Sequence, residues 1–216
     1  MPSFETLATF SLAAFLLCIA PGPSNLYVMA RSISQGRQAG ITAASGMILG
    51  SFIYVLASAF GLAAIFLYSP IAYSAVKLAG AAYLFYLASV YFSLAKQHVN
   101  QPQTLPNLDN KTIFKQSLVV ELTNPKTALF FIAFLPLFTD PSRGSLSVQL
   151  LVLGCLFAVI GFMSDILVAT LSGKIGVWMS THPNSTQWQN RLSASLLFAI
   201  AGFIVYEEIL AFFNPN

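Results

Sequence analysis

Two long apolar stretches of this chain are broken by proline, and the second also carries a lysine near its centre. The breaks are Pro21-Gly22-Pro23 in the first stretch and Asn124-Pro125-Lys126 in the second. Apolar stretches of about 20 residues or more are long enough to cross a lipid bilayer. A broken backbone and a charged side chain are both costly in hydrocarbon, because lipid offers them no partners. The fold must therefore bury both breaks against other parts of the protein.

Charged residues are too few for a soluble protein. The 216 residues are 56% hydrophobic and only 8% charged, whereas soluble domains carry about 25% charged residues. The sequence therefore predicts an all-α integral membrane protein, with residues 1–216 forming a single membrane domain. We expect a lipid bilayer as its surroundings and no nucleic acid as a partner.

Uncharged runs divide the chain into six predicted membrane spans. The run from Gln38 to Val76 would be about 58 Å long as one helix, too long for about 30 Å of hydrocarbon. Ser69-Pro70 divides this run, because proline and the residue before it both disfavour helix. The predicted spans are 6–30, 41–67, 71–94, 113–138, 146–172 and 192–213.

Basic residues lie mostly on one side of these spans. Only Arg143 falls in a loop on the opposite side. Because Lys and Arg near span ends stay in the cytoplasm, both termini are expected outside. The seven basic residues on the expected cytoplasmic side are Arg31, Arg37, Lys96, Lys111, Lys115, Lys174 and Arg191.

The six spans divide into two halves of three. Residues 1–94 form the first half, 95–112 a polar cytoplasmic linker, and 113–216 the second half. An odd number of spans in each half inverts the second half relative to the first, and each half begins with a proline-broken helix. The sequence thus predicts two inverted three-helix repeats, with a solute site near mid-depth where they meet.

The first break predicts an unwound backbone that faces a cavity. Pro21 and Pro23 each lack a backbone N–H, and Gly22 adds conformational freedom between them. Carbonyl oxygens of the preceding turn lose their helical partners and must find others. Together with the polar side chains of Ser24 and Asn25, such carbonyls suit a zwitterionic solute. A simple proline kink is the alternative.

The second break places a cation deep in the membrane. Lys126 follows Asn124 and Pro125 and lies about 12 residues from either end of its span, where a lysine costs about 3 kcal/mol. Its ammonium could bind a substrate carboxylate, or it could pair with Glu121 or Asp165. A structural ion pair that locks helices together is the alternative.

Three further charged side chains lie within predicted spans. Glu121 and Asp165 are carboxylates that could exchange protons or bind a substrate ammonium. Exposure in a cytoplasmic vestibule or a salt bridge would explain them equally well. Lys77 is a weaker candidate, because it lies about two turns from the outer end of its span and can snorkel to the interface.

Other motifs limit the possible functions. The sequence has no cluster of metal ligands and no phosphate-binding loop, so neither a metal site, nor ATP use, nor an enzyme is expected. Cys18 and Cys155 leave open a membrane thiol–disulfide oxidoreductase of the DsbD/CcdA type, although Cys155 is not at the matching break. A passive small-solute channel is a further alternative. Gly46 and Gly50 form a small-residue pair that lets another helix approach, so a homodimer is possible.

Several of these motifs together resemble the LysE/RhtB family of bacterial amino-acid exporters, of the homoserine, threonine and lysine efflux type. The resemblance covers nearly the whole chain. Its motifs are Pro21-Gly22-Pro23, Ser45-Gly46 to Gly50, Lys77 with Gly80-Ala81-Ala82-Tyr83-Leu84, Asn124-Pro125-Lys126, Phe130-Phe131 and Leu135-Pro136.

The resemblance implies a multi-pass protein of the bacterial cytoplasmic (inner) membrane. It implies efflux of amino acids or small derivatives by secondary transport, an antiport driven by the proton motive force without a cofactor. Two positions depart from the family pattern. Ala88-Ser89 stands where members often have a further glycine, and Glu121 where they often have a neutral polar residue. Glu121 is therefore a candidate determinant of specificity or coupling.

Overall fold

The computed structural model is helical throughout, and no strand occurs in the residues that it describes, which are 1–19, 22–64, 69–95, 106–181 and 185–213. This agrees with the predicted all-α class. The first part of the chain forms α1 (Phe4–Ile19), α2 (Pro23–Gln35), α3 (Arg37–Ala57), the π-helical turn η1 (Ser58–Leu62) and α5 (Pro70–Leu94). The second part forms α6 (Asn110–Leu122), α7 (Pro125–Leu129), the π-helical turn η2 (Phe130–Phe134), the 3-10 turns η3 (Leu135–Phe138) and η4 (Pro141–Arg143), α8 (Leu146–Thr181) and α9 (Ser185–Phe213).

Proline begins the helix that follows each interruption predicted from the sequence. Pro23 and Pro125 occupy the first turns of α2 and α7, where the missing N–H removes no helical hydrogen bond. Pro70 likewise begins α5. At the turn between α2 and α3, Gly36 has a φ of 84°, a conformation that favours glycine. Local sequence thus determines where these helices begin.

Three helices of the described chain are long and apolar enough to cross a membrane, namely Arg37–Leu62, Leu146–Gly173 and Asn190–Leu210. The pair α1 and α2 is bent by 53°, and α6 with the segment Pro125–Phe138 by 45°; counting each bent pair as one span gives up to five. The described apolar part of α5, Leu78–Ser93, is shorter. A helical membrane protein is therefore supported, while six spans and inverted repeats stay predictions.

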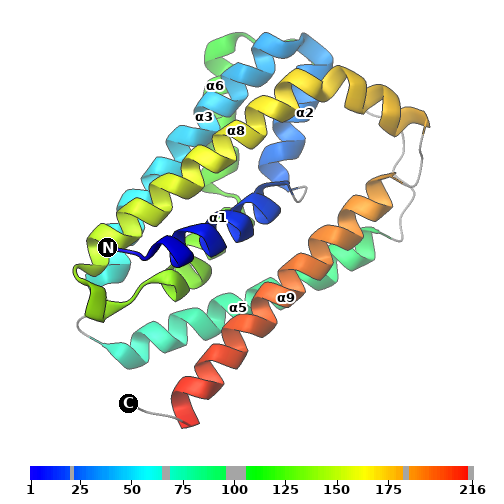
Figure 1. Ribbon diagram of the computed structural model, residues 1–216. Coiled ribbons are helices and arrows are strands. Elements are labelled where there is room, and N and C mark those ends of the chain that lie inside the picture. Colours follow the sequence, from blue (N-terminus) through cyan, green and yellow to red (C-terminus); the bar gives the residue numbers. More distant parts are fainter. Residues whose placement is uncertain (20–21, 65–68, 96–105, 182–184, 214–216) are drawn as a thin grey trace.

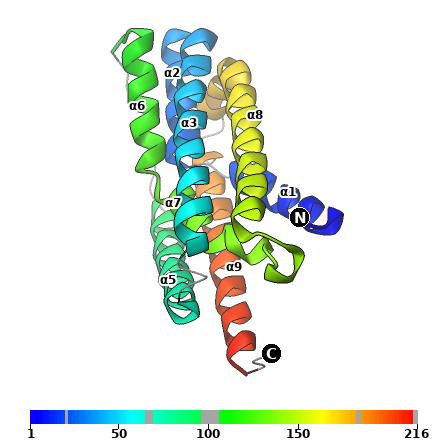
Figure 2. The same ribbon diagram turned by 90° about the vertical axis from the view of Figure 1, so that its left-hand side faces the viewer.

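The helices form two groups (Figures 1 and 2). In the group that we call the main bundle, α3 packs against α6 and α8, α2 packs against α3 and α8, and α1 packs against α8. The second group is the α5–α9 pair, whose two helices lie side by side (Figure 1). The segment α7–η2 joins the two groups, because η2 contacts both α5 and α9.

The small-residue face of α3 lies against α6. A Cβ added at Gly46 would come within 2.5 Å of the Phe114 carbonyl oxygen, and one at Gly50 within 2.8 Å of Glu121 Cγ. Only glycine permits this approach of the two helices. Because the partner of this face belongs to the same chain, the Gly46–Gly50 motif does not support a homodimer.

Large apolar side chains cover the outside of the molecule. Phe60, Met163 and Phe198 are 67%, 62% and 56% exposed. Exposed apolar side chains of this size and number are expected where lipid surrounds the helices. Buried polar and charged side chains include Ser24, Glu121, Asn124, Lys126 and Asp165. The interior therefore contains polar and charged side chains as well as an apolar core.

Candidate functional site

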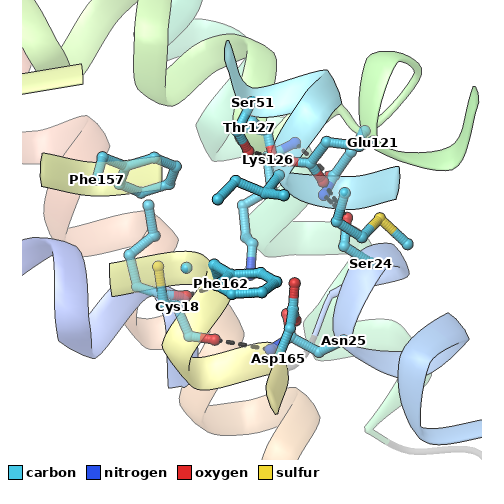
Figure 3. Close-up of a pocket in the computed structure, with 15 residues that line it drawn as sticks. Cys18, Ser24, Asn25, Ser51, Glu121, Lys126, Thr127, Phe157, Phe162 and Asp165 are labelled. Atoms are coloured by element: carbon cyan, nitrogen blue, oxygen red, sulfur yellow. Dashed lines mark hydrogen bonds between the residues drawn. The ribbon is translucent and has the colours of Figure 1, made fainter. Parts of the chain in front are cut away.

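A polar cavity of about 40 Å³ lies inside the main bundle. Both proline breaks contribute to its walls, and Figure 3 shows side chains from α1, α2, α3, α6, α7 and α8 around it. Its polar and charged lining residues are Ser24, Asn25, Ser51, Glu121, Asn124, Lys126, Thr127 and Asp165. A cavity of this volume has room for a few water molecules. The polar residues of the two breaks therefore meet in one place.

The first break leaves a carbonyl that Lys126 reaches. In an α-helix the carbonyl at Leu17 would accept from the N–H of Pro21, four residues on, but proline has none. Lys126 Nζ donates to this oxygen instead, at 3.2 Å. The lysine is only 7% exposed. The amine thus connects α7 to the broken end of α1.

Gly22 makes room for this amine. A Cβ built at Gly22 would lie 2.9 Å from Lys126 Nζ and 3.0 Å from Lys126 Cε. Any side chain at this position would therefore displace the end of the lysine. The glycine of the first break and the lysine of the second are directly complementary.

The next carbonyl, that of Cys18, also accepts from side chains. Asn25 Nδ2 donates to it at 2.8 Å, and Ser164 Oγ of α8 at 3.4 Å. The first break is therefore satisfied largely by side-chain donors from three different helices, α2, α7 and α8. Carbonyl oxygens held this way can also accept from a solute that carries an ammonium group.

The second break is capped by its own residues. Asn124 Oδ1 accepts from the backbone N–H of Lys126 at 3.0 Å, as an N-cap of α7, and the Asn124 N–H donates to the Glu121 carbonyl at 3.1 Å. Tyr54 OH of α3 donates to the Leu122 carbonyl at 2.6 Å. Among the described residues, Tyr54 is the one donor from another segment to the backbone of this break.

Glu121 lies at the centre of a hydrogen-bond chain. Asn124 Nδ2 donates to Ser24 Oγ at 2.7 Å, and the Ser24 hydroxyl donates to Glu121 Oε2. Ser51 Oγ of α3 donates to Glu121 Oε1 at 2.8 Å. Both carboxylate oxygens are therefore engaged, and the chain connects α2, α3, α6 and the cap of α7.

Asp165 of α8 is the second carboxylate of the cavity. The side chain is 7% exposed and lies beside the cavity together with Asn25 (Figure 3). In the part of the chain that the structure describes, no hydrogen bond reaches its carboxylate oxygens. Asp165 is therefore less constrained than Glu121 and more available to a proton or a bound ammonium.

Two further sets of side-chain contacts join elements around the cavity. From α2, Tyr27 OH donates to Gln116 Oε1 of α6 at 2.9 Å, and Arg31 donates to Gln116 Oε1 at 3.3 Å and to the Pro106 carbonyl at 3.0 Å. Between η2 and α8, the rings of Phe130 and Phe157 stack with centroids 3.9 Å apart. The first set is polar and the second is aromatic.

Most of the predicted site residues gather at this cavity. Gly22, Asn25, Glu121, Asn124, Lys126 and Asp165 lie at it or next to it, and Pro23 and Pro125 begin the two helices that face it. Pro21 and the side chain of Lys77 lie outside the described residues. Among the described residues no group of three or more His, Cys, Asp or Glu could hold a metal ion. Cys18 and Cys155 are free thiols.

Sequence reasoning missed three donors, Ser51, Tyr54 and Ser164. Each is an ordinary polar residue within an apolar span and belongs to no local motif. A search for polar residues at the same depth as the breaks would have found them, because a broken helix needs donors at that depth.

Two broken membrane helices that meet at a buried polar cavity are typical of small-solute transporters. Comparison with protein families agrees: residues 15–208 match the LysE type translocator family. The chain belongs to this family, which confirms the resemblance noted in the sequence motifs. Because members of this family are translocators, an enzyme such as a thiol–disulfide oxidoreductase is not favoured.

Relatives of this chain include two efflux proteins. It is 31% identical over 155 residues to the leucine efflux protein of Enterobacter sp. (strain 638), which is 72% of this chain and 74% of that protein. It is 29% identical over 156 residues to the leucine efflux protein of Salmonella choleraesuis (strain SC-B67), covering 71% and 73%. It is 30% identical over 174 residues to an uncharacterized membrane protein of Pseudomonas aeruginosa, covering 79% and 81%. No solved structure matches the chain significantly.

Proposed function

We propose that this protein exports amino acids with apolar side chains from the cytoplasm, in exchange for protons, across a bacterial inner membrane. The observation that carries the proposal is the buried ammonium of Lys126, which joins the two helix breaks inside a cavity that also contains Glu121 and Asp165. The names of two relatives, leucine efflux proteins, support an apolar amino acid as the substrate.

The cavity offers complementary groups to a zwitterion. Lys126 and the N-terminal ends of α2 and α7 would attract the carboxylate, because helix N-termini carry partial positive charge. The carbonyls of Leu17 and Cys18, or the carboxylate of Asp165, would take the ammonium. Since Lys126 Nζ now donates to the Leu17 carbonyl, the substrate ammonium would replace it there while the lysine turns to the substrate carboxylate.

The volume of the cavity implies movement. About 40 Å³ accommodates a few water molecules but not an amino acid, so binding requires the helices around the breaks to separate. The polar contacts of Tyr27 and Arg31 with Gln116 would separate on the cytoplasmic side, because the basic residues of the loops are expected on that side. The stacked rings of Phe130 and Phe157 would separate on the outer side.

Helix contacts support the inverted-repeat organisation. The broken helix α1–α2 would correspond to α6–α7, with α3 corresponding to α8 and α5 to α9. Under this correspondence α3 packs against both its counterpart α8 and the broken α6, while α8 packs against α3 and the broken α1. The predicted halves, residues 1–94 and 113–216, would then rock against each other around the fixed cavity.

The decisive experiment is transport by the purified protein in liposomes. Vesicles loaded with labelled alanine, leucine, phenylalanine, threonine or lysine should release apolar amino acids fastest, and an imposed proton gradient should drive leucine against its own gradient. Flux that ignores the proton gradient would instead indicate a passive channel. A Cys18→Ser, Cys155→Ser double variant should transport normally, and loss of flux in it would revive a thiol mechanism.

A further inference from the structure

A second cavity lies on the other side of Lys126, where the main bundle meets the α5–α9 pair. It measures about 10 Å³. Leu17 and Lys126 line both this cavity and the polar one. The remaining walls include Leu84 of α5, Phe134 of η2, and Leu197 and Ile200 of α9. Apart from Lys126, every side chain that lines it is apolar.

The two cavities match the two chemical parts of an amino acid, its charged groups and its side chain. An α-amino acid carries two charged groups and a side chain on one carbon atom. The polar cavity holds the ion-binding groups, and Leu17 and Lys126 line both cavities. A polar side chain placed against Leu84, Leu197 and Ile200 would lose its hydrogen bonds, whereas an aliphatic one would not.

Packing is uneven along the seam, which is the region where the main bundle meets the α5–α9 pair. At Gly80, η2 approaches α5 so closely that an added Cβ would lie 2.6 Å from Ala133 Cβ. One turn further along α5, at Leu84, the cavity begins. The main contacts of the α5–α9 pair with the rest of the described chain run through α7 and η2. Lys126 also lines this cavity, so a movement of this lysine towards a carboxylate would enlarge the apolar space.

We infer that this apolar cavity is the subsite for the side chain of the exported amino acid, and that Leu84, Leu197 and Ile200 set its size. The inference rests on the proposed function and adds which residues select the substrate. Aliphatic side chains would be favoured over polar ones, because the walls are apolar apart from Lys126. The substrate would then lie between the main bundle and the α5–α9 pair, with Lys126 at its carboxylate.

The test changes the size of the subsite and measures ratios of efflux. Leu84→Phe should lower leucine efflux relative to alanine efflux by about tenfold, and Leu84→Ala should raise phenylalanine efflux relative to leucine efflux by about tenfold, as pocket size does elsewhere. Leu87→Phe and Leu87→Ala are matched controls, because Leu87 lies on the same helix and is buried in the α5–α9 contact without lining the cavity. Their ratios should equal those of the unchanged protein.

Efflux ratios distinguish an effect on the subsite from misfolding and from failure of the proposed function. Should Leu84→Phe fail to reach the membrane, Ile200→Ala should raise the phenylalanine-to-leucine ratio in the same way. Unchanged ratios in inserted Leu84 and Ile200 variants, while the unchanged protein exports leucine, would overturn the inference alone. No efflux of alanine, leucine or phenylalanine by the unchanged protein would overturn the proposed function, and the subsite with it.

Discussion

The two proline breaks of this protein are closed in different ways. The second is closed locally, because Asn124 caps α7 with its side chain and donates its backbone N–H to the Glu121 carbonyl. The first has Gly22 at the N-cap position, where no side chain is available to cap the helix. The freed carbonyl of Leu17 accepts instead from Lys126, a residue of the second break.

This difference indicates which break responds to a solute. A self-capped break keeps its shape whatever binds beside it. A break whose carbonyl accepts from another segment changes when that donor moves away. Under the proposed function, a substrate carboxylate would compete for the Lys126 ammonium. The first break is therefore expected to be the mobile element, while the second acts as a rigid platform that presents the lysine.

Removing Lys126, the donor to the Leu17 carbonyl, should have the largest effect on transport. Lys126→Ala leaves the Leu17 carbonyl without this donor and removes the proposed carboxylate-binding group. Losing one partner of a buried charged contact costs about 2–5 kcal/mol, which is at least about thirtyfold in affinity. Leucine efflux from liposomes should therefore fall to background.

The control for this prediction is Lys115→Ala, which removes the same charge from an exposed position on α6. It should transport at the normal rate. Normal efflux from a correctly inserted Lys126→Ala variant would contradict the role assigned to Lys126.

The two carboxylates should differ in function, as the two breaks do. Glu121 is engaged at both oxygens by Ser24 and Ser51, whereas no hydrogen bond among the described residues reaches the carboxylate oxygens of Asp165. A gradient of one pH unit supplies about 1.4 kcal/mol per proton, enough for about tenfold accumulation. Asp165→Asn should abolish this proton-driven accumulation, and Glu121→Gln should slow transport but retain it. The reverse result, measured as leucine accumulation at fixed gradients, would assign the proton to Glu121.

The positions of the two breaks and the burial of Lys126 were predictable from the sequence, because they depend on residue types with strong local rules. Proline at Pro23 and Pro125 determines where the half-helices begin, and the burial of Lys126 follows from its depth in an apolar span. The all-α class and the opposition of the two breaks follow from the same patterns.

The partners of these groups were not predictable. The sequence predicts a substrate carboxylate, Glu121 or Asp165 as the partner of Lys126, and it does not predict a backbone carbonyl. The contact with Leu17 depends on how α7 crosses α1. Tyr54 and Ser164 donate to freed carbonyls from helices far away in sequence. Likewise, Gly46 and Gly50 predicted a close helix contact, but tertiary packing alone determines that the partner is α6 of the same chain.

Gly22→Ala should reduce leucine efflux by less than Lys126→Ala does. The new methyl group would lie 2.9 Å from Lys126 Nζ, so the flexible end of the lysine must move and its hydrogen bond to Leu17 is lost. A hydrogen bond from a charged group contributes about 1.5–3 kcal/mol, and leucine efflux should fall by about tenfold or more. Gly202→Ala, where nothing lies within 4 Å of an added Cβ, should leave efflux unchanged. Equal rates in the two variants would mean that the position of the Lys126 amine does not affect efflux.

The smallest effect is expected at the self-capped break, and it should appear in stability rather than in transport. Asn124→Ala removes the N-cap of α7, which is worth about 1 kcal/mol, and should lower the Tm of the purified protein by about 2–4 °C. Asn124→Ser keeps a capping oxygen and should recover most of this loss. At the first break, Asn25→Ala leaves the Cys18 carbonyl with Ser164 as a donor, so its Tm should change less while its efflux changes more. If Asn124→Ala instead abolishes leucine efflux at an unchanged Tm, the second break is a moving part and not a platform.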